Sequence, residues 1–177
     1  RQNMKKFLFL IFTFFIFFSC NESNETKFEK DGVSFICPQG WAITDQEDFD
    51  GKGYYISIEK DGFNSSGLAV ITWYDNFDNS NFNFEEDLRD WEESLKEQWI
   101  LDASNIIFGD YYDNTFNNSR SMSTNYTLNL LGIPHEGTVY VFHAGNKRIS
   151  VMLQEAIEDK AKNKKGFEMI ENNFKSE

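Results

Sequence analysis

The sequence predicts an α+β fold in which helices pack on an antiparallel sheet as an α+β sandwich. Residues 54–60 alternate apolar and polar side chains, which is typical of a half-buried strand. One apolar stripe, with spacings of four, three, four and four residues, predicts a helix and consists of Phe84, Leu88, Trp91, Leu95 and Trp99. Several connections have hairpin length, which favours antiparallel neighbours. We therefore expect the order strands, helix, strands, helix.

Turn-forming residues separate the strands that are expected before this helix, at 33–37, 41–44, 54–60 and 68–74. The acidic segment 45–53 is expected to be a loop, and the polar segment 76–83 a linker. Asn83 is the expected N-cap of the helix, because the carboxylates at 85–87 suit the positive end of the helix dipole.

Four more strands are expected after the helix, at residues 105–112, 119–131, 137–144 and 147–155. Residues 132–136 and a tight hairpin at 145–146 should connect the last three. A closing helix is expected from residue 158 to about residue 174, with its apolar positions at Ala161, Phe167, Ile170 and Phe174.

The N-terminal segment has the order of a secretory signal peptide. Two lysines follow Met4, residues 7–18 are apolar except for Thr13, and Ser19 and Cys20 come next. This ending resembles the lipobox of bacterial lipoproteins, which implies that Cys20 receives a diacylglyceryl thioether and begins the mature protein. Twelve apolar residues make roughly 18 Å of helix, short of a bilayer core of about 30 Å, so an uncleaved membrane anchor is the less favoured alternative.

The chain therefore divides into three parts: residues 1–19 as a signal peptide with upstream residues, 20–31 as a polar, lipidated tether, and 32–177 as one domain. The formal net charge is −12, and it becomes −15 once residues 1–19, with three basic residues, are removed. This charge argues against nucleic-acid binding and against electrostatic adhesion to anionic lipid. It is typical of a soluble surface, and the alternative is a cationic partner.

Cys20 and Cys37 are the two cysteines of the sequence. If Cys20 is a thioether, Cys37 lies in an apolar run as a buried free thiol. The alternative is a Cys20–Cys37 disulfide in a protein that is exported without lipid.

Two segments resemble PsbP-like domains. Residues 32–41, GVSFICPQGW, resemble the opening of that family: Ser-Phe, two residues, Pro, one residue, Gly-Trp. The far end, at 140–151 and 166–174, resembles its ending, in which two hairpin strands lead to a helix that stops at Ser-Phe; here Asn173 stands where the family often has Ser. The resemblance implies an α-β-α sandwich around an antiparallel sheet. It also implies protein binding, because relatives include a photosystem II subunit, envelope lipoproteins and toxin chaperones.

Candidate metal ligands gather in the acidic segment, where carboxylates at 45, 47, 48 and 50 have the chemistry that Ca²⁺ prefers: Asp45, Glu47, Asp48 and Asp50. The twelfth position counted from Asp45 is Ile56, which does not fit an EF-hand, so a solvated loop with weak or no Ca²⁺ binding is the better interpretation. His135 and His143 lie eight residues apart with no cysteine pair nearby, which argues against zinc. We expect neither a metal nor a cofactor.

The sequence carries no catalytic signature. It contains no Gly-x-Ser-x-Gly and no glycine-rich phosphate loop. Cys37 precedes a proline and has no basic neighbour to activate it, which argues against a thiol–imidazole pair with His135 or His143. The 29 acidic residues allow too many carboxylate pairs for any one of them to be informative.

Candidate binding residues are the aromatic pairs Trp73-Tyr74 and Tyr111-Tyr112, which stand at strand ends beside polar loops. Neighbouring residues of a strand point to opposite faces, so one member of each pair should face outward, where Trp and Tyr are typical interface anchors. The alternative is that these aromatic side chains belong to the core. We expect a lipid-anchored, non-catalytic protein of the bacterial cell envelope that binds another protein through an exposed face. The alternatives are a chaperone or immunity-type lipoprotein and an envelope hydrolase with paired carboxylates.

Overall fold

The computed structural model describes residues 25–62, 66–75, 83–98 and 106–177. Within them, one large antiparallel sheet contains eight strands: β3 (Trp41–Asp48), β4 (Gly53–Lys60), β5 (Leu68–Tyr74), β6 (Ile107–Phe108), β7 (Tyr112–Phe116), β8 (Ser119–Leu130), β9 (Ile133–Ala144) and β10 (Lys147–Ala156). Their order is β3-β4-β5-β10-β9-β8-β6, and β7 also pairs with β8. The central strand β10 thus joins the first half of the chain to the second.

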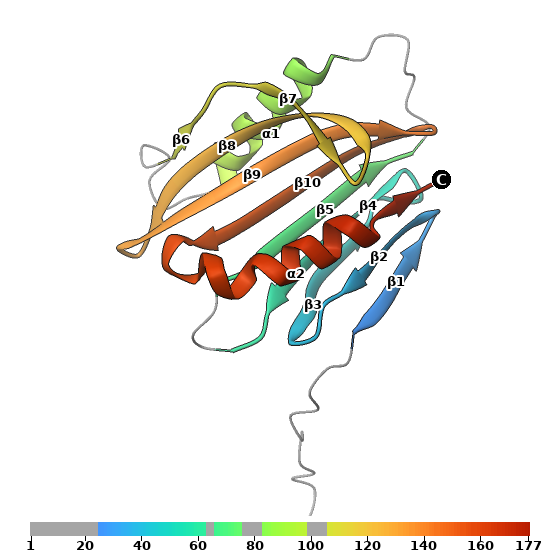
Figure 1. Cartoon of the computed structure of the whole chain (residues 1–177). Coiled ribbons are helices and arrows are strands. Elements are labelled where there is room, and N and C mark those ends of the chain that lie inside the picture. Colours follow the sequence, from blue (N-terminus) through green and yellow to red (C-terminus); the bar gives the residue numbers. More distant parts are fainter. Residues whose placement is uncertain (1–24, 63–65, 76–82, 99–105) are drawn as a thin grey trace, which may run out of the picture.

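The remaining elements lie on the two faces of this sheet (Figure 1). A small sheet contains β1 (Thr26–Lys30), β2 (Val33–Cys37) and β11 (Lys175–Ser176), and the helices are α1 (Phe84–Gln98), α2 (Lys160–Asn173) and the short 3₁₀ helix η3 (Ile157–Asp159). The small sheet and α2 cover one face, whereas α1 covers part of the other. The predicted α+β class with a mostly antiparallel sheet is therefore confirmed.

Strand alternation divides the apolar side chains between two cores. On β5, Ile71 and Trp73 point into the core beneath α2 and β2, together with Ile170 of α2. Val70, one residue away, packs in the second core with Leu88 of α1. Each face of the large sheet is thus stabilised by its own hydrophobic cluster.

The helix predicted from the apolar stripe is α1. Leu88 and Leu95 are buried, and Trp91 is half-buried against Phe108 and Tyr126. Trp99, the last member of the stripe, lies outside the described residues. The predicted N-cap is also confirmed, because Oδ1 of Asn83 accepts the backbone N–H of Glu85 at 3.1 Å.

Several predicted boundaries are wrong because strand pairing extends through polar residues. β3 continues to Asp48, so residues 45–48 of the expected acidic loop are part of a strand paired with β4. β9 begins at Ile133, since the turn from β8 consists only of Leu131 and Gly132, both with positive φ. The strand expected at 105–112 is divided into β6 and the start of β7. The closing helix begins at Lys160, after η3.

The expected tether is wrong for Thr26–Lys30, which is strand β1. Asp31 and Gly32 both have positive φ, as a two-residue hairpin turn requires, and this turn folds β1 back on β2. Phe28 then stacks on Phe35, with ring centroids 4.9 Å apart. Residues 20–24 of the expected tether, including Cys20, lie outside the described part of the chain.

The two ends of the domain meet in the small sheet. β11 pairs with β2, and the backbone N–H of Glu177 donates to the carbonyl of Gly32 at 3.1 Å. Ile170 and Phe174, just before β11, are buried in the same core as β2. The N-terminal hairpin and the C-terminal helix therefore complete one another.

Two glycines make room for the side chain of Trp41. Its indole is buried and lies between Gly67 and Gly166, with Phe167 edge-on at 5.3 Å. A Cβ atom at Gly166 would lie 2.4 Å from Cζ2 of Trp41. Glycine costs a helix interior about 1 kcal/mol relative to alanine. Here it is needed because any side chain would push α2 off the indole.

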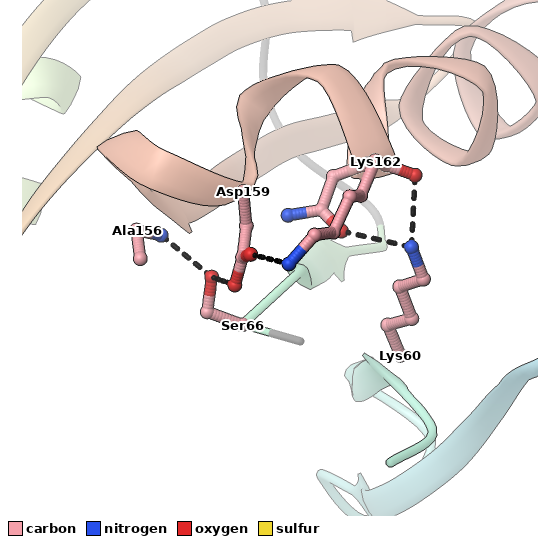
Figure 2. A network of polar contacts seen from close by, with 6 residues as sticks. Lys60, Ser66, Ala156, Asp159 and Lys162 are labelled. Atoms are coloured by element: carbon pink, nitrogen blue, oxygen red, sulfur yellow. Dashed lines mark hydrogen bonds and ion pairs between the residues drawn. The ribbon is translucent and has the colours of Figure 1, made fainter. Parts of the chain in front are cut away.

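A polar network fixes the start of α2 against the β4–β5 connection (Figure 2). Ser66 Oγ accepts the N–H of Ala156 at 2.7 Å and donates to Oδ2 of Asp159 at 3.1 Å. Oδ1 of Asp159 accepts from Lys162 at 2.6 Å, and Lys60 donates to the carbonyl of Lys162 at 2.8 Å. Chiefly because of the hydrogen bond from Lys162, the pKa of Asp159 is held below its usual value. These contacts position a helix, and we assign them a structural role.

Candidate functional site

A large groove runs beside α1, over the part of the sheet that the helix leaves uncovered. A helix is about 10 Å across and strands are about 4.8 Å apart, so a single helix covers only two or three strands. α1 packs mainly on β8 and β9. The groove has a volume of about 1120 Å³, with side chains of β3, β4, β5 and β10 facing it from the sheet and those of α1 from the other side.

The floor of the groove mixes apolar and polar side chains. Val70 and Met152 provide apolar surface next to the hydroxyls of Ser57, Thr72 and Ser150. Trp91 and Leu95 of α1 form an apolar part of the wall. The surface can therefore bury apolar groups of a ligand and still hydrogen-bond to its polar ones.

A β-bulge brings two carboxylates into this groove. Trp41 and Ile43 of β3 face α2, through their pairing with Lys60 and Ile58. The register shifts between Ile43 and Asp45, so Asp45 and Glu47 pair with Ser57 and Tyr55 and line the groove on the opposite face. Bulges are known to redirect side chains in this way.

Charge in the groove is strongly unbalanced. Among the described residues, its lining contains five carboxylates and a single cationic side chain: Asp45, Glu47, Glu59, Asp87, Asp90 and Arg148. Nη2 of Arg148 lies 2.6 Å from Oδ1 of Asp87 and 3.9 Å from Oδ2 of Asp90. The one guanidinium is thus already engaged by the helix, and the groove is net negative.

Asp87 is the most unusual of these carboxylates. It stands in the first turn of α1 and is only 5% exposed. Its Oδ1 pairs with Arg148, but Oδ2 is buried and has no hydrogen-bond partner among the described residues. Burial raises the pKa of the Asp87 carboxyl to about 6, against the opposing effect of Arg148.

Of the first predicted aromatic pair, only Tyr74 reaches the surface. Trp73 is fully buried and stacks on Tyr54 at 5.1 Å, so it cannot be an exposed anchor. The reason is strand alternation, which turns Trp73 toward α2 and Tyr74 toward the groove. Tyr74 is 46% exposed and stacks on Phe49, with centroids 5.5 Å apart, at the groove lining.

The second pair does not join Tyr74 in one surface. Tyr112 pairs with Ser123, which pairs with Tyr140, so Tyr112 lies on the α2 face of the sheet. It is exposed, and its hydroxyl donates to Asn125 at 3.1 Å. Tyr111 is half-buried against the α1-side core, where burial and Glu92 raise its pKa to about 12.

The structure separates the four candidate Ca²⁺ ligands. Asp45 and Glu47 line the groove, whereas Asp48 pairs with Lys30 at 3.0 Å and accepts the N–H of Gly51 at 2.8 Å. Asp50 lies exposed in the turn after β3. In the described ranges, no group of three or more His, Cys, Asp or Glu side chains could hold a metal ion.

Cys37, His135 and His143 do not line the groove. Cys37 is a buried free thiol whose Sγ lies 3.5 Å from the carbonyl of Trp41. Burial raises its pKa, and Asp61 adds to this effect, so the thiolate is disfavoured. His135 and His143 are eight residues apart on β9, about 27 Å along an extended strand.

Within the described residues, no helix combines the length and the apolar character needed to cross a lipid bilayer.

Known proteins resemble this chain in fold rather than in sequence. No protein-family model matches it, and no curated protein matches it. The solution structure of cyanobacterial PsbP (CyanoP) from Synechocystis matches with a TM-score of 0.58 and 11% identity, and the match covers 90% of this chain and 98% of that chain. The domain has a PsbP-like fold. The resemblance inferred from residues 32–41 and 140–174 is thereby confirmed.

Two further solved structures belong to bacterial proteins. A Bacteroides thetaiotaomicron protein matches with a TM-score of 0.55 and 13% identity over 86% of this chain, but over only 48% of its own length. LpqN, which is involved in cell envelope biogenesis of Mycobacterium tuberculosis, has a TM-score of 0.49 and 12% identity over 85% of this chain and 89% of that chain. This last value is too low to support an inference about the PsbP-like domain.

Sequence reasoning missed the groove and its central residues. In the sequence, Asp87 is only one of three acids in the first turn of a predicted helix, and Arg148 is only part of a predicted hairpin strand. Their contact joins positions 61 residues apart in the sequence. No local pattern could have indicated it.

Proposed function

We propose that this chain is a lipid-anchored, non-catalytic protein of the bacterial cell envelope that binds a partner protein in the groove beside α1. The observation that carries the proposal is the groove itself, which is broad, half-open and lined by both apolar and polar side chains. Protein-binding surfaces have this mixed character, with aromatic anchors at well-packed positions. Tyr74 and Trp91 are the aromatic side chains best placed for that role.

A hydrolase with paired carboxylates is the second candidate, and one observation favours it. Asp87 and Asp90 approach the same guanidinium nitrogen, and the pKa of Asp87 is raised to about 6 by burial, as that of a general acid can be. However, both carboxylates approach Nη2 of Arg148, so the guanidinium stands where a substrate bond would have to lie between an acid and a base. We therefore favour binding.

The lipid anchor is tested at Cys20. In bacteria fed an alkyne fatty-acid probe, the wild-type protein is expected to be labelled and Cys20→Ala is not, because only a lipobox cysteine receives a diacylglyceryl group. Cys37→Ala is the matched control and should keep its label, because Cys37 is buried. Label that persists in Cys20→Ala, or that disappears in Cys37→Ala, would contradict the anchor.

The binding face is tested with two exposed tyrosines on opposite faces of the sheet. A photo-crosslinking residue at Thr72, on the groove floor, is expected to capture a discrete partner in intact cells, whereas one at Lys164 on α2 is not. Tyr74→Ala should weaken binding of the captured partner at least about 30-fold, as loss of a hot spot does. Tyr112→Ala should change it less than about 2-fold, since this side chain lies on the α2 face.

The converse pattern, with binding lost in Tyr112→Ala and kept in Tyr74→Ala, would move the interface to the other face. Hydrolysis of an envelope polymer by purified protein, abolished in Asp90→Asn, would replace the binding proposal by the catalytic one.

A further inference from the structure

The carboxylates of the groove surround it from three elements. Asp45 and Glu47 come from β3, Glu59 from β4, and Asp87 and Asp90 from α1. Of the described side chains that line it, Arg148 alone is basic, and it is held by the two aspartates of α1. Charge of one sign along a cleft with apolar walls is concentrated there and attracts ligands of the opposite sign. The groove is thus complementary to a cationic ligand.

A second observation points to the same ligand from a different direction. Oδ2 of Asp87 is a carboxylate oxygen that is buried at the groove and has no hydrogen-bond partner in the described part of the chain. Nearly all buried polar atoms in native proteins are hydrogen-bonded, and an exception calls for an explanation. A guanidinium or ammonium group that enters the groove would supply the missing donor.

We propose that the partner of the proposed function, on which this inference rests, enters the groove as an extended segment rich in arginine and lysine. One cationic side chain of this segment donates to Oδ2 of Asp87. The remaining cations of the segment lie along Asp45, Glu47 and Glu59. Arg148 keeps its place on Oδ1 of Asp87, so the carboxylate is shared between one guanidinium of the domain and one cation of the partner.

The size and the aromatic lining of the groove favour a peptide over a small ion. Pockets for single small molecules have volumes of about 300–1,000 Å³, and this groove, at about 1120 Å³, lies above that range. Tyr74, stacked on Phe49, and Trp91 offer ring faces on which the cations and methylene stems of Arg and Lys can rest. A bound metal ion is disfavoured by the absence of a suitable ligand cluster among the described residues.

The test uses a fluorescein-labelled octapeptide of alternating arginine and leucine and measures its anisotropy with the purified protein. The peptide is expected to bind, with an affinity that falls as salt increases, and the glutamate–leucine analogue is not. Asp87→Asn should weaken binding at least 10-fold. Asp113→Asn is the matched control, because it removes the same charge from an exposed position outside the groove, and it should change the affinity less than 2-fold.

Asp87 is buried in the first turn of α1, so a second variant guards against a loss of binding that is caused by misfolding. Asp45→Asn combined with Glu47→Gln changes only exposed side chains of β3 and should also weaken the arginine peptide at least 10-fold. If both variants bind the peptide like wild type, or if the peptide does not bind while Thr72 still crosslinks to a partner, the cationic segment is wrong and the proposed function stands. Spermidine that competes at the same concentration as the peptide would show a small-cation site and overturn the segment.

Discussion

Replacing Trp73 by alanine is expected to lower the free energy of unfolding by about 3–5 kcal/mol, the range for deletion of a large buried aromatic side chain. Trp73 is fully buried, stacks on Tyr54 and meets Phe28 edge-on at 6.5 Å. Its removal opens a cavity beneath β1 that these rings cannot close without leaving their own contacts. Urea unfolding followed by far-ultraviolet circular dichroism measures the effect.

The adjacent Tyr74→Ala is the matched control and should cost less than about 1.5 kcal/mol. Its side chain is 46% exposed and loses only its stacking on Phe49. Equal losses in the two variants, or an unchanged unfolding midpoint for Trp73→Ala, would mean that β5 does not present these faces.

The second large effect is a pH dependence that originates at Asp87. Its carboxyl faces Arg148 of β10 and Asp90 and Glu86 of its own helix, and burial raises its pKa from 3.8 to about 6. The folded state therefore holds this proton more tightly than the unfolded state does. Protonated Asp87 therefore makes its whole contribution to the free energy of unfolding below about pH 4, and this contribution is lost as the pH rises through 6.

Asp87→Asn cannot ionise and should escape this loss. The free energy of unfolding of the variant, minus that of wild type, is expected to rise by roughly 2–3 kcal/mol between pH 4 and pH 7. Denaturant unfolding at several pH values measures the difference. A difference that stays level or falls with pH would show that Asp87 is ionised in the folded protein at low pH.

The parts of the fold that could be predicted are those with a local periodic signal. Leu88 and Leu95 mark the buried side of α1, and the alternation in 54–60 marks β4. Boundaries were less predictable, because β3 and β9 continue through acidic residues and a proline only when a neighbouring strand pairs with them. The turn at Asp31-Gly32 was a usable signal for β1 that the polar composition of 21–30 obscured.

The candidate site could be predicted only in part. Alternation requires one of Trp73 and Tyr74 to face outward, but which one depends on the side that α2 covers. Whether Tyr74 and Tyr112 share a face depends on the pairing of β5, β10, β9, β8 and β7 together. Asp45 and Glu47 enter the groove through a bulge, and a one-residue shift of this kind has no signature in composition.

The pairing of β11 with β2 has a consequence for how the protein is made. The core beneath α2 lacks Ile170 and Phe174 until those residues leave the ribosome, and β2 lacks its second neighbour until residues 175–176 follow. Contacts between such distant segments form late and slowly. We expect the domain to complete its fold only after residues 170–176 are available, because β2 and the core beneath α2 are incomplete without them. In the proposed envelope location, this late closure would keep the chain unfolded for passage through a narrow export channel and would lock the domain afterwards.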